Sequence, residues 1–239
     1  MSTQRSEICP DPVRRAVMRQ RWQDLAYLHW RYDPEVVASL LPKGLEVDTF
    51  DGSVWVGLIP FSMRGIGLAR GPAVPYLGSF AEVNVRTYVR VGKVPGVWFF
   101  SLDVDRLLPA LVARTTYRLP YCWGITSHVR TGDHLHTIVN RRWPHRVETS
   151  HLEITAGAPV EADDLSVFLT ARWGLYSATR SGVRYAPVDH EPWPLRSAAA
   201  TRWDDTLIRA AGLPEVHGDP HVLFSDGVDV RIGLPHRVR

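Results

Sequence analysis

One stretch of the sequence, FAEVNVRTYVRV at residues 80–91, carries four polar side chains at alternate positions. Successive side chains of a β-strand point to opposite faces, so Glu82, Asn84, Arg86 and Tyr88 share one face and the valines share the other. Two interpretations are open at this point. The valines enter the core while the polar set faces water, or the polar set lines a concave surface that holds a ligand by hydrogen bonds.

The stretch YLHWRYD at residues 27–33 poses the same choice. As a strand it places Tyr27, His29 and Arg31 on one face. An arginine beside a tyrosine and a histidine is suited to bind a carboxylate through two hydrogen bonds. The other interpretation is an ordinary surface or ion-paired arginine.

Metal and cofactor sites have little support in the sequence. His134 and His136 share a strand face, but the spacing supplies no third ligand beside them, so we expect no metal. The sequence has no glycine-rich phosphate loop, G-x-S-x-G elbow or H-E-x-x-H helix, and we expect no cofactor. Cys122 is either a nucleophile or, as its aromatic neighbours favour, a small buried hydrophobic residue.

Composition bounds the class of protein. The 239 residues carry a formal net charge of only +3, and the basic residues are dispersed, which disfavours a nucleic-acid partner. No apolar run is long enough to span a membrane, and the N-terminus has no secretory signal, so we expect a cytoplasmic protein with no membrane partner. Cys9 and Cys122 are expected to stay reduced. Lysine occurs only at Lys43 and Lys93.

The elements that must position these residues are mostly strands. Many short strands, two or three helices and no βαβ alternation predict an α+β fold, with mostly antiparallel or mixed sheets curled into a sandwich or barrel. We expect residues 1–18 to form a flexible N-terminal arm and residues 19–239 a single domain. The predicted helices begin after Asp33, at residues 106–118 and at an aspartate cap within residues 163–178. Strands are predicted at residues 80–91, 134–140, 143–149, 151–156 and 221–232, a tight turn at Asp51–Gly52, and a loop over residues 63–79.

Four segments together resemble the DUF2071, or YqjF-like, family: SFAEVNVRTYV, GVWFFSLDVD, YRLPYCW and FLTARWGLYSA with VRYAPVDHEPWPL. The resemblance runs from about residue 19 to about residue 233. That family is similar in turn to acetoacetate decarboxylase. The resemblance implies a closed, barrel or cone-like β structure with a few peripheral helices around an internal pocket.

The decarboxylase resemblance also nominates residues. WRYD matches the context of an arginine that engages the substrate carboxylate, which implies that role for Arg31. GSFAE matches the context of a glutamate on the next long strand, which implies Glu82 and makes its face the pocket face. LPYCW occupies the place of the lysine pair that forms and tunes an imine with the ketone. Tyr121 and Cys122 stand there instead, so the imine chemistry is expected to be lost.

What remains is a set of groups suited to acid–base chemistry. The implied catalytic residues are Glu82, Arg31 and Tyr121, and the implied substrate-binding residues are His29, Asn84, Arg86, Tyr88, Cys122, His190 and Trp193. For His190 and Trp193 the alternative is a structural role, with the tryptophan packed against the neighbouring prolines. Such a site would carry out enolisation, aldol-type bond formation, dehydration or cyclisation of a small carbonyl or carboxylate compound. The alternative is a non-catalytic protein that binds a small molecule in the same lumen. A homo-oligomer is possible in either case.

Overall fold

The computed structural model describes residues 6–68, 71, 78–106, 118–144, 147–180 and 182–238. Most of them belong to one sheet of thirteen strands. The strands are β1 (Met18–Tyr32), β2 (Glu46–Val47), β3 (Val54–Leu68), β4 (Phe80–Val91), β5 (Val94–Val104), β6 (Tyr121–Thr131), β7 (His134–Trp143), β8 (Thr149–Pro159), β9 (Gly174–Thr179), β10 (Gly182–His190), β11 (Leu195–Asp205), β12 (His221–Ile232) and β13 (His236–Arg237). The helices in the described residues are α1 (Pro34–Ser39), α3 (Asp164–Thr170) and α4 (Leu207–Ala210).

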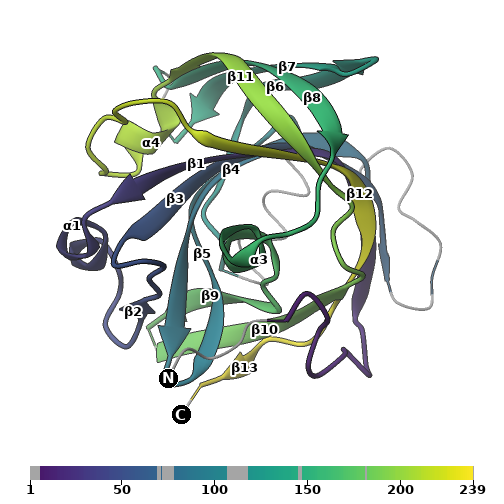
Figure 1. The fold of residues 1–239 in the computed structure, drawn as a ribbon. Coiled ribbons are helices and arrows are strands. Elements are labelled where there is room, and N and C mark those ends of the chain that lie inside the picture. The colour runs from purple at the N-terminus through teal and green to yellow at the C-terminus, as the bar shows by residue number, and fades with distance from the viewer. Residues whose placement is uncertain are drawn as a thin grey trace.

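Two strands, β5 and β12, each pair at one edge with two different strands at different points along their length, and these pairings close the sheet into two rings. Along one edge, β5 pairs with β9 through Val97 and Trp98, and with β6 through residues 102–104. In the same way β12 pairs with β11 through residues 223–225 and with β10 through residues 230–232. Nine strands therefore close one ring (β5, β6, β7, β8, β11, β12, β1, β3, β4), and seven close the other (β5, β9, β10, β12, β1, β3, β4). The closed β structure expected from the family resemblance is confirmed (Figure 1).

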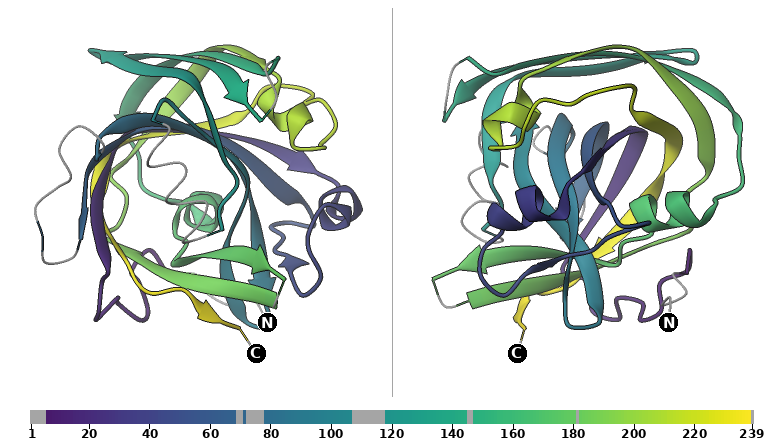
Figure 2. Two further views of the ribbon diagram at one scale, coloured as in Figure 1. Left: turned by 180° about the vertical axis from the view of Figure 1, so that it is seen from behind. Right: turned by 60° about the vertical axis from the view of Figure 1, so that its left-hand side comes forward.

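The strands common to both rings form a shared wall, which we define as β12, β1, β3, β4 and β5. Figure 2 shows β6, β7, β8 and β11 curling over this wall on one side. Between these two layers lies an aliphatic core, to which β3 contributes Val54, Val56 and Leu58. The alternate residues Ile59, Phe61 and Met63 enter the seven-strand ring on the other side of the wall. The middle of the wall is thus buried on both faces.

Helix α3 lies within the seven-strand ring (Figure 1). Its N-cap is Asp163, whose carboxylate accepts a hydrogen bond from the Ser166 amide at 2.7 Å, as the sequence predicts for an aspartate cap. Phe168 and Leu169 are completely buried, and Phe168 packs against Trp55 and Tyr88 of the wall. The helix therefore fills part of the ring interior and packs against the wall.

Of the other local predictions, some are confirmed and some are wrong. The helix after Asp33 is confirmed as α1, and Asp51 and Gly52 form a tight turn with φ of 52° and 76°. The strand predicted over residues 143–149 is wrong, because β7 ends at Trp143 and β8 begins at Thr149. The loop predicted from residue 63 begins later, because β3 continues to Leu68 by pairing with the start of β1.

Two further predictions concern residues that the structure describes only in part. The helix predicted at residues 106–118 falls almost entirely outside the described residues. In the predicted arm, Cys9 and Val13 are buried, and the Val13 amide donates to the Asp189 carboxylate. Both cysteines are free thiols. None of the described helices is long and apolar enough to cross a membrane.

Candidate functional site

The polar face of β4 points into the seven-strand ring. Glu82, Asn84, Arg86 and Tyr88 are 2%, 3%, 8% and 0% exposed, respectively. Val83 and Val85, on the opposite face, are fully buried in the aliphatic core between the wall and the overlying strands. Neither face meets water, because β4 belongs to the wall that both rings share. The polar set is therefore an interior surface, as the second interpretation of the strand requires.

Glu82 forms a buried acid pair with Tyr121. Strand β6 begins at Tyr121, whose hydroxyl donates to Oε2 of Glu82 at 3.3 Å. Burial raises the pKa of Glu82 to about 8; hydrogen bonds from Asn84 and Tyr121 act against that rise, and the Asp103 charge adds to it. Burial also raises the pKa of the Tyr121 hydroxyl. The pair thus combines a carboxyl group that titrates near neutrality with a phenol that keeps its proton.

A second network surrounds the hydroxyl of Tyr88. This hydroxyl donates to the Leu169 carbonyl of α3 at 2.7 Å, and it lies 2.6 Å from Nε2 of His29 and 3.2 Å from Nη2 of Arg86. Since its one proton goes to Leu169, it accepts from both nitrogens, which places the proton of His29 on Nε2. Burial holds the pKa of His29 well below its usual range, so this imidazole is neutral.

Gly57 makes room for this network. It pairs with His29 of β1 on one side and with Arg86 of β4 on the other. A Cβ at position 57 would lie 2.7 Å from Nε2 of His29, closer than real contacts allow. A larger residue here would push the imidazole away from Tyr88.

Several buried polar atoms on this surface have no hydrogen-bond partner among the described residues. They are the Tyr27 hydroxyl, His29 Nδ1, Asn84 Oδ1 and Arg86 Nε. Two are donors and two are acceptors, given the His29 tautomer above. Buried polar groups are rarely left unpaired, so this surface is suited to a ligand with both donors and acceptors.

Aromatic side chains border the polar residues. The ring of Trp193 stacks on that of Trp22 at 6.1 Å and meets the edge of Tyr27 at 5.6 Å, while its indole donates to the Thr170 carbonyl. His190 packs between Trp173 and Trp193, at 4.5 and 4.8 Å. Tyr27 also lies beneath the guanidinium of Arg86 at 5.6 Å. His190 and Trp193 thus lie beside the polar surface rather than apart from it.

Two predicted site residues lie elsewhere. Arg31 shares the face of Tyr27 and His29 but is exposed at the end of β1, with its guanidinium 5.0 Å from the Trp55 ring. Its partner on β3 is Trp55, whereas that of Glu82 is Phe61, six residues along, which separates Arg31 from Glu82 by roughly 20 Å.

Cys122 is the second residue outside the cluster. It is buried, but it follows Tyr121 directly in β6 and therefore points to the opposite face. There it lies on the side of Arg141, away from Glu82. The structure does not bring this thiol toward Glu82.

Lysine is absent from the interior. Lys43 and Lys93 are both exposed, and they are the only lysines in the sequence. Neither lysine therefore lies beside Glu82, where it could form an imine with a bound ketone. The buried cations among the described residues are arginines: Arg86, Arg141, and Arg172, which pairs with buried Asp48 at 2.5 Å.

Sequence reasoning missed some residues of this surface. The carbonyl of Leu169 carries no side-chain signature, so only the placement of α3 reveals it. Trp22 lies at the start of β1, outside the segments that carry the family resemblance. Arg172 and Asp48 are separated by 124 positions, and no pattern in the sequence links them.

The sequence matches a known protein family over most of its length. The DUF2071 family, described as an uncharacterized conserved protein, matches residues 19–229. A relative named "Uncharacterized protein YqjF", from Bacillus subtilis, is 33% identical over 216 residues, covering 90% of this chain and 89% of the relative.

Solved structures resemble the whole chain at low sequence identity. An acetoacetate decarboxylase-like enzyme from Sphingomonas wittichii has a TM-score of 0.66 at 17% identity and covers 97% of both chains. An acetoacetate decarboxylase has a TM-score of 0.67 at 15% identity, covering 95% of this chain and 91% of its own. The enduracididine biosynthesis enzyme MppR, complexed with pyruvate, has a TM-score of 0.64 at 13% identity, covering 93% and 90%. At these identities the likeness establishes the fold.

Proposed function

This chain belongs to the DUF2071 family, and from that premise we propose that it is a cofactor-independent enzyme acting by acid–base chemistry on a small carbonyl or carboxylate compound. The observation that carries the proposal is Glu82, a fully buried carboxyl group with a pKa of about 8 beside a phenol. Groups with such perturbed pKa values gather at catalytic sites, where a base must titrate near the working pH.

The proposed step is removal of a proton from the carbon next to a carbonyl. Ionised Glu82 takes the proton, the C–H electron pair moves to form a carbon–carbon double bond, and the carbonyl oxygen becomes an enolate. The unpaired donors of Tyr27 and Arg86 stabilise that oxygen or an attached carboxylate, and Tyr121 holds the Glu82 carboxylate in place through its hydrogen bond. The resulting enolate is the common entry to isomerisation, aldol-type addition and dehydration.

Pyruvate is a suitable first probe, because a structural relative, MppR, was solved in complex with it. We expect the protein to exchange the methyl protons of pyruvate for deuterium in D₂O, as followed by proton NMR. Because only deprotonated Glu82 is a base, the rate should rise with pH and level off above about 8. Glu82→Gln should slow the exchange by about 100-fold or more, since general bases contribute at least that much.

The matched control is Glu161→Gln, which changes an exposed glutamate and should leave the exchange unchanged. Equal rates in the Glu82→Gln variant and the wild-type protein would remove Glu82 from the mechanism. Pyruvate binding without any exchange would favour the alternative, a non-catalytic binding protein.

A second experiment separates this chemistry from imine catalysis. Borohydride added with pyruvate or acetoacetate should leave no covalent adduct in the intact mass spectrum, because both lysines lie on the surface. An adduct mapped to Lys43 or Lys93 would overturn the proposal.

A further inference from the structure

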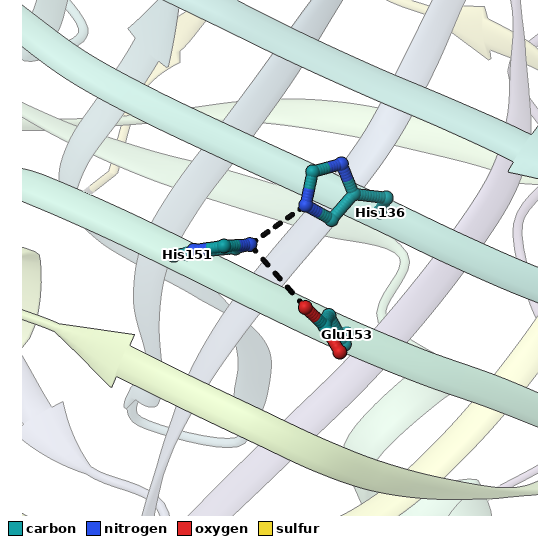
Figure 3. Close-up of side chains that lie close together, drawn as sticks. All are labelled: His136, His151 and Glu153. Carbon is teal, nitrogen blue, oxygen red and sulfur yellow. Dashed lines mark hydrogen bonds and ion pairs between the residues drawn. The ribbon is translucent and has the colours of Figure 1, made fainter.

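The outer face of β7 and β8 gathers three metal-ligating side chains outside the barrel interior. His136 of β7 pairs with Glu153 of β8, and His151 lies two residues before Glu153 on the same strand and the same face. Neighbouring residues Leu135 and Leu152 point inward to the aliphatic core, so these three side chains point outward. Their ligand atoms all lie within 4.8 Å of one another (Figure 3).

The two imidazoles face each other through the same kind of atom. Nε2 of His136 lies 2.6 Å from Nε2 of His151, and the latter lies 3.5 Å from Oε1 of Glu153. Only one proton fits between the two nitrogens, because two imidazolium N–H groups would repel each other at this distance. A cation that accepts both lone pairs satisfies the arrangement equally well, and the carboxylate supplies the balancing negative charge.

We propose that His136, His151 and Glu153 bind a divalent first-row transition metal, with Zn²⁺ as the defining case. Zinc prefers imidazole nitrogen and carboxylate oxygen at about 2.0–2.2 Å in a tetrahedral arrangement. The ligand atoms need small rotations to reach those distances, and the partly exposed side chains have the freedom to make them. Three protein ligands leave a fourth position for water, as in open zinc sites.

Access to the proposed metal comes from a surface hollow. His136 and Glu153 form part of its lining, together with Val129, His134 and Thr201. The hollow leaves room for the water ligand. The sequence predicts no metal here because it offers only the pair His134 and His136, whereas the strand register supplies the other ligands.

Two neighbours bear on the proposed site. Arg202 of β11 lies 3.9 Å from Glu153 and competes for its carboxylate, but its Nε donates to Asp204 at 2.6 Å, which holds it partly aside. His134 lies two residues before His136 on the same face, but its Nδ1 is 3.1 Å from the Thr155 hydroxyl. We assign His134 no ligand role, and it therefore provides a matched control.

The test is titration of the metal-free full chain with Zn²⁺ by calorimetry, repeated with Co²⁺ to read ligand-field absorption bands. We expect a single bound Zn²⁺ per chain. His136→Ala, His151→Ala and Glu153→Gln should each weaken binding by at least about tenfold, since loss of even a supporting group costs that much. His134→Ala should bind Zn²⁺ like the wild type, and Arg202→Gln should bind it more tightly.

The ligands lie on the outer face, so these variants should fold, which far-UV circular dichroism checks. Zinc-dependent shifts of the imidazole proton resonances of His136 and His151 would give an independent readout. Failure of the wild-type chain to bind Zn²⁺ would overturn the proposal. So would equal losses in the His134→Ala variant, or unchanged binding in the three ligand variants, since the metal would then bind elsewhere.

Discussion

At the scale of single residues, Glu82 is a carboxyl group whose environment departs far from that of a free side chain. Its carboxyl is surrounded by protein on a wall buried on both faces, and the two hydrogen bonds it receives do not offset the loss of water. The same burial that equips it as a base makes its ionisation costly for the fold.

The stability of the protein should therefore decrease with pH in a defined window. Below about pH 4.5 the carboxyl of Glu82 is protonated in both the folded and the unfolded chain. Between pH 4.5 and about 8 only the folded chain keeps the proton, so the free energy of unfolding falls by up to about 1.4 kcal/mol per pH unit. Above about pH 8 both states have lost the proton, and this dependence ends.

Urea unfolding at a series of pH values, followed by circular dichroism, measures this effect. Glu82→Gln removes the titrating group and should flatten the curve over the same window, while the exposed-site variant Glu161→Gln should retain the wild-type slope. Identical slopes in the wild type and the Glu82→Gln variant would mean that Glu82 ionises in the folded chain as easily as in the unfolded one.

Residue patterns predicted which strand face lines the barrel interior, but not how far along the strand that interior extends. Alternation in β4 and the family resemblance together identified the face of Glu82, Asn84, Arg86 and Tyr88, and that face is interior. The same alternation grouped Arg31 with His29, yet Arg31 is exposed. Alternation fixes the face of a strand but not how far along the strand the barrel interior reaches.

At the scale of elements, the short helix α3 of seven residues connects several parts of the barrel interior by hydrogen bonds. Its last turn presents the Leu169 carbonyl to Tyr88 and Arg86, and the Thr170 carbonyl to Trp193. Backbone carbonyls near the end of a helix have no partner within the helix and are free to accept such bonds. The helix thereby links the wall to the β10–β11 connection.

Removing the cap of α3 should loosen this arrangement. Asp163→Ala loses the hydrogen bond to the Ser166 amide and should lower the free energy of unfolding by about 1 kcal/mol. Chemical denaturation gives the value. Asp164→Ala, which changes the adjacent exposed aspartate but keeps the cap, should cost less, and an equal cost would show that the cap is not the source.

Some elements could be predicted because their limits have local causes. Asp33 and Asp163 cap helices, and Asp51–Gly52 forms a turn with positive φ, all within a few residues. The strand predicted over residues 143–149 is wrong. Strand β11 was not predicted, because the limits of β11 depend on its pairing with β8 and β12 rather than on its own residues. Long-range pairing has no local signature.

At the scale of the whole molecule, a buried ion pair joins the wall to the strands above it. Nε and Nη2 of Arg141 in β7 donate to Oδ1 and Oδ2 of Asp103 in β5, at 2.6 and 2.7 Å. The side chains are only 4% and 1% exposed. The Ser101 hydroxyl donates to the same carboxylate, which completes a closed polar group in the nine-strand ring.

Arg141→Met should be strongly destabilising, by roughly 3–5 kcal/mol, because it leaves the Asp103 charge buried without its partner. Combining it with Asp103→Leu should recover much of the loss, since the uncompensated charge is then gone as well. Urea unfolding of the single and double variants forms a double-mutant cycle. A double variant as unstable as the sum of the two single variants would show that the two side chains act independently.

The shared wall also constrains which sequences this fold accepts. A strand that covers one core tolerates change on its outer face, but β4 has no outer face over most of its length: Val83 and Val85 fit one interior, and Glu82 and Asn84 fit the other. A slip of one position would place carboxyl and amide groups among aliphatic side chains and valines beside Tyr121. During evolution the middle of β4 is therefore free to change only by substitutions that suit one particular interior, whereas strands with one exposed face, such as β7 and β8, can acquire new surface chemistry on that face.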